Sequence, residues 1–574
     1  MSTKNAMSKF GIQISNVEAA VVYEYNKGLR DSLDPVKALF STSLLSDFLF
    51  ENGLKTKNNK STQDIVCVSF GFGCASYEEN VKRIKKQIKN SEDNEYRLEK
   101  YKNLLEKIEK NKDLYEKISA QELREIFYTD GFSITYDKEK SSEHTINYKM
   151  FYRTPGKAKQ GAVMFINEEL YEKAINFIRM GIQLPGQNAR IVEISAYSSL
   201  IASSIVDRIQ IRPEEILVLK DVDSFINKDA ISVELDDDGH CAAKKKENYR
   251  IKSTLFDGQA LIDSSIFPEW GNGYVLLRHH FCKCAAFSAN IQLFFQDYFG
   301  NGYQTATLKD MFGREVRVRD IKLITTDNAM KWLKLGVGFD YWADWVRKNG
   351  SLFGVVKTAH ESKIGTLQRM SYQMVNSLDM SIMDSALEMT DTYVRRLKED
   401  DEFFKDHLRK NINYSNDYDV LLALLEKVPE FERTDYFKTR RWQIIGNYIS
   451  LINNGRILQN ADNLVIVGSP YGMLLHAVGE DPLQDPTFQT EESAIQCWTE
   501  RFEDGEYLAE FRSPFNSRNN LGYMHNVCDE RFLRYFNFGK QIIAVNMVGT
   551  DFQDRNNGLM AGPVLQKCSS KTIQ

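Results

Sequence analysis

The sequence of 574 residues lacks several features that would assign it to a special class. It has no apolar run close to the roughly 18–20 residues that a membrane span needs, and the opening MSTKNAMSKF has no apolar core of the signal-peptide kind. The eight cysteines are scattered without Cys-x-x-Cys spacing, which argues against a zinc site and favours free thiols in a reducing cytosol. We therefore expect a cytoplasmic protein that does not enter a membrane.

An excess of positive charge is also missing. The chain has 74 lysines and arginines against 79 aspartates and glutamates, a net charge of −5, so no global field attracts nucleic acid. Any nucleic-acid binding would therefore need local basic surfaces. No internal repeat and no long low-complexity tract is visible in the sequence. By length alone the chain can form roughly four domains.

The N-terminal part, residues 1–147, is expected to be an α/β region with a charged helical hairpin at 77–118. Apolar residues recur there at spacings of three and four, which is typical of amphipathic helices. The basic run KRIKKQIK (82–89) could contact a phosphate backbone, but a solvated helix face is the more common explanation. Ser119 and Glu122 have the spacing of a capping box and predict the start of the next helix.

Strand and turn patterns prevail from 148 to 375, helical patterns from 376 to 455, and strand patterns again from 456 to 574. The segment 148–166 predicts two strands around a turn at Pro155-Gly156, with Arg153, Lys157 and Lys159 at its tip. Such a tip can enter a groove, so contact with nucleic acid or a triphosphate and plain exposure to solvent stay equally open.

Two further segments combine basic and apolar residues. In 255–296, the expected strands Tyr274–Leu277 and Cys284–Phe287 surround two cations and two histidines; these four residues are Arg278, His279, His280 and Lys283. Adjacent histidines on a strand face opposite ways, which argues against a metal pair. In 355–378, cations and amides alternate with an aromatic residue, which suits a single-strand channel or an ordinary solvated loop and helix.

The C-terminal residues contain an ordered series of motifs. The stretch EFRSPFNSRNNLGYMHN (510–526) has an Arg512-Ser513-Pro514 loop, and FNFGKQIIAVNMVGTDFQDRNNG (536–558) follows with an expected strand at Gln541–Val548. This order resembles the single-chain two-barrel RNA polymerases, which include the RNA-dependent enzymes of eukaryotic RNA silencing and the single-subunit polymerases of bacterial prophages. In that family the Arg-x-Pro loop precedes strands that lead into an Asp-x-Asp-x-Asp loop.

The resemblance implies an α+β fold with two double-psi β-barrels joined by a helical connection. The first barrel with insertions would occupy 148–375, the helical connector 376–455, and the second barrel 456–574, after the N-terminal α/β region. It further implies template-directed nucleotidyl transfer from nucleoside triphosphates, an RNA or single-stranded DNA template, and magnesium, because this chemistry depends on positioning and on neutralising charge at phosphorus.

The resemblance also implies site residues. Lys283 and Arg512 are the candidates for catalytic contacts to phosphate and nucleotide, since lysine and the arginine fork bind such groups. Candidates for contact with nucleic acid or nucleotide share a basic or polar side chain in the motif-rich segments; they are Arg153, Lys157, Lys159, Arg278, Lys357, Lys363, Arg369, Tyr372 and Asn516.

The aspartate triad itself has no counterpart after Gly558, where the chain reads LMAGPVLQKCSSKTIQ. We therefore expect no metal ligands in this chain. Asp551 and Asp554 are three residues apart and would face opposite sides of a strand, so a supporting turn is favoured over a metal pair. Three explanations stay open: the chain is truncated or frameshifted before the loop, a second polypeptide supplies it, or the protein is a non-catalytic nucleic-acid-binding or phage-defence scaffold on the same fold.

Overall fold

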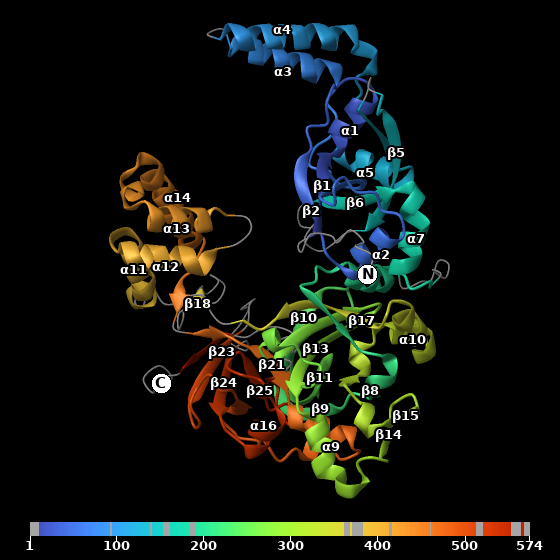
Figure 1. Cartoon of the computed structure of the whole chain (residues 1–574), viewed down its shortest axis with the longest axis vertical. Helices are drawn as coiled ribbons and strands as arrows, with labels where there is room; N and C mark the ends of the chain where they lie inside the picture. Colours follow the sequence, from blue (N-terminus) through green and yellow to red (C-terminus); the bar gives the residue numbers. More distant parts are fainter. Residues whose placement is uncertain are drawn as a thin grey trace. The chain divides into compact units, whose positions relative to one another are not determined.

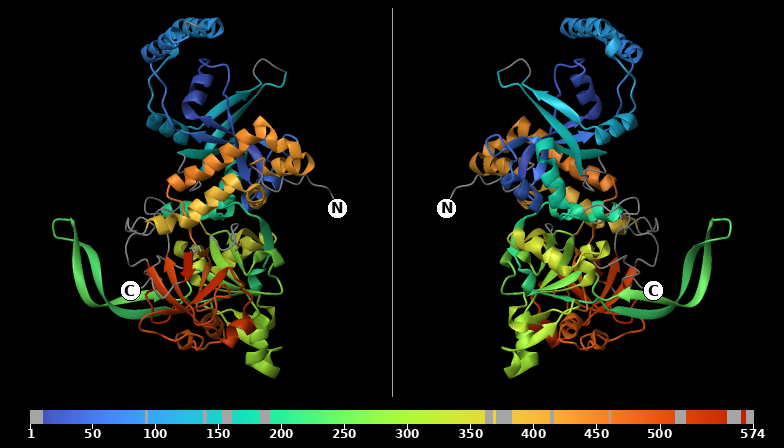
Figure 2. Two further views of the ribbon diagram at one scale, coloured as in Figure 1. Left: turned by 90° about the vertical axis from the view of Figure 1, so that its left-hand side faces the viewer. Right: turned by 90° about the vertical axis from the view of Figure 1, so that its right-hand side faces the viewer.

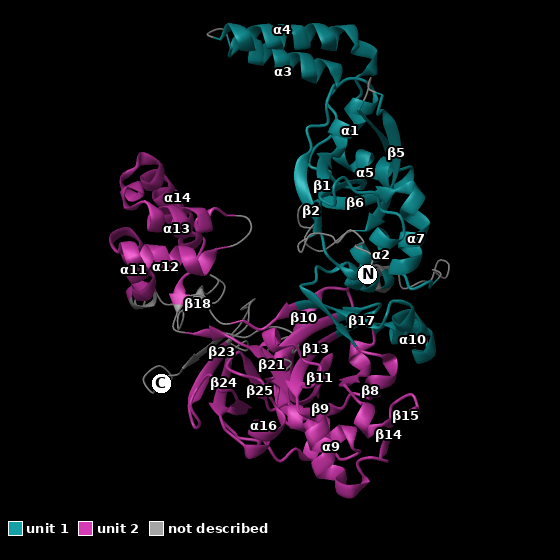
Figure 3. Ribbon diagram, in the orientation of Figure 1, with its two compact units in different colours: residues 1–210, 278–283, 331–356 teal, residues 211–277, 284–330, 357–574 magenta. Residues whose placement is uncertain are grey.

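The computed structural model describes residues 11–91, 94–137, 141–152, 161–182, 191–360, 368–369, 383–412, 416–459, 461–511, 521–552 and 564–567. It mixes helices and sheets, as the expected α+β class requires (Figure 1). The chain divides into two compact units (Figure 3): Met1–Gln210, Arg278–Lys283 and Lys331–Val356 form unit 1, and the remainder forms unit 2. Among the described helices, none is both long and apolar enough to span a membrane.

Unit 1 is built on a six-stranded sheet of order β2-β1-β3-β6-β5-β4. The strands are β1 (Gly11–Glu18), β2 (Val36–Ser41), β3 (Ser61–Ser69), β4 (Phe132–Tyr136), β5 (His144–Tyr152) and β6 (Ala162–Asn167). Neighbouring residues of β3 belong to different cores, Cys67 to one and Val66 to the other, because side chains alternate across a strand. Helices α2 (Leu44–Glu51) and α7 (Glu168–Ile178) contribute to the first core, and α1 (Ala19–Asn26) and α5 (Ala120–Thr129) to the second.

The charged segment of unit 1 forms two helices, α3 (Tyr77–Lys89) and α4 (Glu95–Lys110), which contact each other. The periodicity of apolar residues predicted these two helices. Lys82 and Lys85 of α3 are exposed, as expected for a solvated helix face. The capping box expected before α5 is present, because Ser119 Oγ accepts from the Glu122 amide at 3.1 Å and Glu122 Oε2 accepts from the Ser119 amide at 2.8 Å. Local sequence signals are sufficient for this part of the chain.

Two seven-stranded sheets follow. The order of the first sheet is β7-β17-β12-β13-β11-β16-β8 and that of the second is β20-β26-β23-β24-β22-β25-β21. The first consists of β7 (Asp207–Gln210), β8 (Ile216–Leu219), β11 (Gln259–Asp263), β12 (Tyr274–His279), β13 (Cys282–Ala289), β16 (Leu323–Thr326) and β17 (Leu352–Thr358). The second consists of β20 (Asp462–Asn463), β21 (Val465–Gly468), β22 (Ile495–Trp498), β23 (Tyr507–Phe511), β24 (Leu521–Asn526), β25 (Ile542–Val545) and β26 (Val564–Lys567).

The two sheets have the same topology. When the strands of each are counted along the chain, both sheets read first, seventh, fourth, fifth, third, sixth, second. The third strand is parallel to the fifth and antiparallel to the sixth, and the sixth is parallel to the second, in both sheets. A helix follows the fifth strand each time, α9 (Ile291–Phe299) and α16 (Glu530–Tyr535). The chain thus repeats an arrangement that its amino-acid sequence does not repeat.

Side chains from both sheets are buried together in one core of unit 2. Leu261 and Phe287 of the first sheet belong to the same buried cluster as Ile466 and Ile543 of the second, and the rings of Phe287 and Phe538 are 6.0 Å apart. Burial of aliphatic and aromatic side chains is the main stabilising contribution in such a core. The two sheets therefore share a hydrophobic core.

The remaining elements complete the units. A helical block with its own core comprises α11 (Met383–Glu399), α12 (Asp401–Asn411), α13 (Tyr418–Lys427) and α14 (Asp435–Asn453), in agreement with the helical pattern there. The strand pattern expected from 456 onward is interrupted after Gly468, because Pro470 begins the helix α15 (Pro470–Ala477). Shorter elements are α8 (Ile191–Ser198), α10 (Phe339–Lys348), β14 (Thr307–Lys309), β15 (Glu315–Arg317), β18 (Gln368–Arg369) and β19 (Leu458–Gln459).

Candidate functional site

A buried glutamine joins the two seven-stranded sheets. Gln259, at the start of β11, donates from Nε2 to the Gly468 carbonyl oxygen at 3.0 Å and accepts at Oε1 from the Gly468 amide at 2.8 Å. Gly468 ends β21, and the next residue, Ser469, is fully buried with a left-handed φ of 36°. Ser469 Oγ accepts from the Met547 amide at 3.2 Å. This corner therefore fixes the start of the segment that follows β25.

The family resemblance described above would place the aspartate loop directly after the segment 546–552. It is anchored to a long hairpin of strands β9 (Asp223–Leu235) and β10 (Cys241–Thr254). The Gly549 amide donates to Ser224 Oγ at 2.8 Å, and Lys228 Nζ lies 2.8 Å from Asp551 Oδ2. Asp551 is thus engaged in an ion pair with its side chain only 14% exposed, whereas Asp554 lies outside the described residues.

The described residues do not fit a magnesium site at this place. Hard cations such as magnesium need several oxygen ligands at close quarters. Within the described ranges, the one group of three or more His, Cys, Asp or Glu side chains that could share an ion is Asp236, Asp238 and His240. These three are exposed at the turn between β9 and β10, and Asp551 has a lysine beside it. The expected magnesium therefore stays a prediction without ligands in this part of the chain.

Three predicted contact residues can be placed in the structure. Arg278 in β12 is 7% exposed and Lys283 in β13 is half-buried, and they flank the two-residue turn between these strands. Lys357, at the end of β17, is exposed. Of Arg369 only the backbone is described, in β18. The predicted residues that lie outside the described residues are Arg153, Lys157, Lys159, Lys363, Tyr372, Arg512 and Asn516. The role of every one of these residues stays a prediction.

Lys357 lines a small cavity of about 70 Å³ together with Tyr274, His360, Asn463 and Gln541. Gln541 is 6% exposed, and its Oε1 has no hydrogen-bond partner among the described residues. Such an acceptor can bind a donor group. Tyr274 is the first residue of β12, and Arg278 lies near the other end of the same strand. The cavity and Arg278 are therefore at opposite ends of β12. Gln541 carries no sequence signal beyond its place next to a strand.

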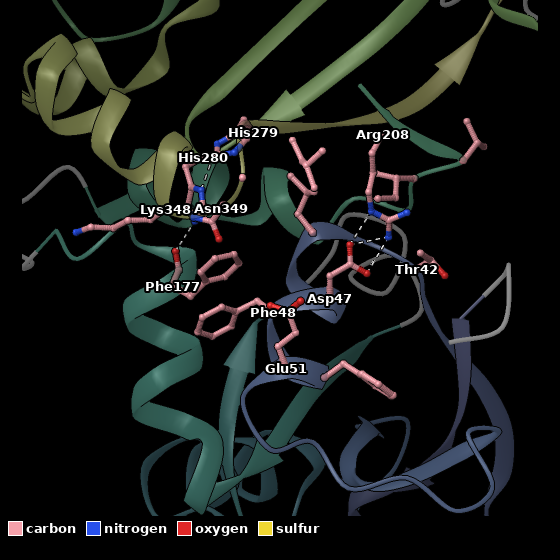
Figure 4. A pocket seen from close by; sticks show the side chains of 16 residues that line it. Thr42, Asp47, Phe48, Glu51, Phe177, Arg208, His279, His280, Lys348 and Asn349 are labelled. Carbon is pink, nitrogen blue, oxygen red and sulfur yellow. Dashed lines mark hydrogen bonds and ion pairs between the residues drawn. The ribbon is translucent and has the colours of Figure 1, made fainter. Parts of the chain in front are cut away.

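Unit 1 contains a larger cavity of about 680 Å³ (Figure 4). On one side the rings of Phe48 and Phe177 stack with their centroids 3.9 Å apart. On the other, Arg208 donates from Nε and Nη2 to the two carboxylate oxygens of Asp47, each at 2.8 Å. Burial raises the pKa of Asp47, and the guanidinium of Arg208 opposes that rise. Volume and lining are in the range of small-molecule pockets.

His279 and His280 line this cavity, and they do not face opposite ways as expected. Their Nδ1 atoms are 3.3 Å apart, because β12 ends at His279 and Phe281 adopts a left-handed φ of 49°. Desolvation lowers the pKa of His280 to about 4 and that of His279 well below its usual value, so both rings are neutral at pH 7.

The hydrogen bond of His280 to one backbone carbonyl determines the tautomers of both rings. His280 Nε2 lies 2.8 Å from the Phe177 carbonyl oxygen, which only accepts, so Nε2 carries the proton. His280 Nδ1 then accepts from the protonated Nδ1 of His279. This leaves His279 Nε2 as a bare acceptor, buried and without a partner among the described residues. Neutral rings with depressed pKa values are weak bases at pH 7, so this cavity suits binding better than acid–base chemistry.

Comparison with known proteins gives a distant likeness among solved structures. No protein-family model matches the sequence, and no curated protein matches it. Among solved structures, the chain is similar to the RNA dependent RNA polymerase QDE-1 from Thielavia terrestris, with 11% sequence identity and a TM-score of 0.45. The similarity covers 74% of this chain and 45% of that chain, so it spans less than half of the polymerase. A likeness at this level says nothing of what this chain binds or does.

Proposed function

We propose that this chain is an RNA polymerase-like protein, which binds an RNA or single-stranded DNA template and nucleoside triphosphates and is impaired in nucleotidyl transfer on its own. The observation that supports the proposal is the repeat of one seven-stranded arrangement in two sheets. Two sheets of identical strand order share one core and are joined by Gln259 and Gly468. A fold with two barrels at a single active site requires such a duplicated and directly joined pair.

The proposal includes the finer assignments. The two sheets correspond to double-psi β-barrels, Lys283 contacts the phosphates of the nucleotide, and Arg512 reads its sugar or phosphate. The impairment follows from the sequence, which has no alternating aspartates after Gly558. Losing the carboxylates that hold a catalytic metal removes the electrostatic stabilisation on which phosphoryl transfer depends. That a second polypeptide supplies them stays a prediction.

The first experiment measures template binding and extension by the purified chain with all four nucleoside triphosphates and magnesium. We expect a single-stranded RNA or DNA to bind and the primer or template not to be extended. Robust magnesium-dependent incorporation that is lost in Asp551→Asn would contradict the impairment and would make Asp551 and Asp554 the leading metal candidates. Absence of any binding to single strands would overturn the polymerase-like assignment altogether.

The alternative is a non-catalytic scaffold on the same fold. Binding of a nucleoside triphosphate distinguishes the polymerase-like protein from this scaffold. If Lys283 contacts phosphates, Lys283→Gln should weaken binding of a nucleoside triphosphate by roughly 10- to 100-fold, since one charge-assisted hydrogen bond contributes roughly 1.5–3 kcal/mol. The matched control is Lys309→Gln, which neutralises an exposed lysine in β14. A chain that binds single strands but no triphosphate favours the scaffold.

A further inference from the structure

In unit 1, of which Figure 2 gives two further views, one face of the helix α2 lines the cavity of Figure 4. The lining side chains have spacings of three and four residues, which place them on one side of the helix; they are Leu44, Asp47, Phe48 and Glu51. Leu45 and Leu49 on the other side of α2 are fully buried in a core of the same unit. The buried side fixes the rotation of the helix, so the lining face stays directed at the cavity.

The helix α2 contributes two carboxylates to the cavity, and the arginine of the lining is bound to only one of them. Arg208 donates from Nε and Nη2 to the two carboxylate oxygens of Asp47, each at 2.8 Å. Glu51 is exposed and has no ion-pair partner among the described residues. Burial raises the pKa of Asp47, and the charge of Glu51 adds to that rise, so the two carboxylates lie close together. One negative charge is thus left uncompensated in the lining.

The other basic side chains of the lining do not neutralise this charge. His279 and His280 are neutral at pH 7, because burial lowers the pKa of each ring. Lys348 extends away from the two carboxylates in Figure 4, and its Nζ lies over the Trp345 ring, 5.5 Å from the centroid. His279 Nε2 is moreover a buried acceptor without a partner among the described residues. The lining therefore favours a ligand with a positive charge and N–H donors.

An aromatic ring lies next to the carboxylates on the same helix face. Phe48 is partly exposed, and it stacks on Phe177, which is 2% exposed, with the ring centroids 3.9 Å apart. The deeper ring supports Phe48 at the cavity wall. Leu44, one helical turn before Phe48, extends the apolar surface. Apolar side chains beside an uncompensated carboxylate are complementary to a cation that is carried on an apolar body.

We propose that this cavity binds a small organic amine, whose ammonium group pairs with Glu51 and whose apolar body packs against Phe48 and Leu44. An ammonium group has three N–H donors and no acceptor, which suits a carboxylate that lacks a partner. The same negative charge repels phosphate groups, so nucleoside triphosphates are not the ligands of this cavity. The amine site consequently does not depend on the polymerase-like assignment. The volume of about 680 Å³ is sufficient for such a ligand.

The first experiment measures binding to the full chain by isothermal titration calorimetry, with probes that differ mainly in charge. Phenethylamine and hexylamine are the cations, phenylethanol is the neutral analogue and phenylacetate is the anion. We expect the amines to bind saturably and phenylethanol to bind at least about tenfold more weakly than phenethylamine, since it lacks the charge-assisted hydrogen bond. Phenylacetate should not bind, because its charge has the same sign as that of Glu51.

Variants of the lining test the assigned contacts. Glu51→Gln should weaken the binding of phenethylamine at least about tenfold and leave that of phenylethanol unchanged. The matched control is Glu109→Gln, which removes the same charge at an exposed position of α4 and should change neither. Phe48→Leu should weaken the binding of both ligands, because each loses the same aromatic contact. Circular dichroism verifies that the variants are folded.

Four results would overturn the proposal. Neither amine binds at concentrations up to about 10 mM, or phenylacetate binds more tightly than phenethylamine. Glu51→Gln binds phenethylamine as tightly as the wild type does, which would remove the carboxylate from the site. An equal loss of affinity in the variants of Glu51 and Glu109 would show an effect of net charge on the whole chain and not a contact in the cavity.

Discussion

The side-chain amide of Gln259 and the backbone of Gly468 satisfy each other completely, with hydrogen bonds of 3.0 and 2.8 Å in the two directions. Gln259 is 3% exposed, and the two residues lie on different sheets that have the same strand order. A glutamine amide suits this place because it offers one donor and one acceptor to a peptide group that no ladder pairs. The contact is one of the polar links between two halves that also share a hydrophobic core.

Gln259→Leu should therefore destabilise the protein strongly. The substitution leaves the amide and the carbonyl of Gly468 buried without partners, and each unsatisfied group costs about 1–3 kcal/mol, so we expect a loss of roughly 2–5 kcal/mol in the free energy of unfolding. Urea denaturation followed by far-UV circular dichroism measures it. Gln484→Leu, at an exposed glutamine of the same unit, should change stability by no more than about 0.5 kcal/mol. Equal effects of both substitutions would contradict the joining role of Gln259.

Asp221 makes stability depend on pH in an unusual direction. Desolvation raises its pKa from 3.8 to about 6, although Asn328 Nδ2 donates to its carboxylate at 2.7 Å. The folded state therefore binds more protons than the unfolded state between these values. The stability from this group is fully present below pH 3.8 and is lost as the pH rises through about 6.

Replacing the carboxyl group of Asp221 should remove this dependence of stability on pH. Between pH 4.5 and pH 7, the wild type should lose about 2 kcal/mol of stability relative to Asp221→Asn. Urea titrations at the two pH values measure the difference. Asp113→Asn, at an exposed aspartate of unit 1, is the control and should follow the wild type. If the difference between the wild type and Asp221→Asn is the same at both pH values, the raised pKa is refuted.

His280 acts in the opposite direction in unit 1. Burial lowers its pKa from 6.5 to about 4, so the unfolded state binds more protons in that window. The stability it contributes is present above pH 6.5 and is lost as the pH falls through about 4. His280→Gln should reduce the loss of stability between pH 7 and pH 4.5 by about 2–3 kcal/mol.

Tryptophan fluorescence reports this change locally, because Trp342 Nε1 donates to the His280 carbonyl oxygen at 2.9 Å. His144→Gln, at an exposed histidine of the same unit, is the control and should keep the acid sensitivity of the wild type. An acid transition that is unchanged in His280→Gln would show that burial does not lower the pKa of His280.

Local signals predicted much of the secondary structure. The capping box of Ser119 and Glu122, the amphipathic spacing of α3 and α4 and the helical block after 383 depend on neighbouring residues, and all are present in the structure. The α+β class follows from them. The repeat of strand order could not be predicted, because it depends on pairing between distant strands, such as β8 with β16, whose residues share no sequence pattern.

The candidate sites were less predictable for the same reason. Gln259 is distinguished by a hydrogen-bond partner far away in the sequence, and Gln541 by a side-chain oxygen without a partner among the described residues. Neither residue lies in a recognisable motif. The alternation rule failed for His279 and His280 because a strand end and the φ of Phe281 turn the second ring back toward the first. Lys283 was noticed for its neighbours in the sequence, and its role stays a prediction.

The last prediction concerns nucleic-acid binding despite the negative net charge. If Lys157 and Lys159 line a binding groove, single strands should bind mainly through ionic contacts, and affinity should fall steeply with salt. Each neutralised phosphate adds about 0.7 to the slope of log affinity against log salt for single strands, so removing both lysines should lower that slope by roughly one to two units.

The matched control neutralises Lys82 and Lys85, which are exposed on α3 and which we assign to a solvated helix face. Salt titrations of single-strand binding for the wild type and both double variants decide the matter. Two lysines are removed in each variant, so a general loss of positive charge would lower both slopes alike. A helix variant that loses the slope while the tip variant keeps it places the groove at α3 and not at the segment 153–159.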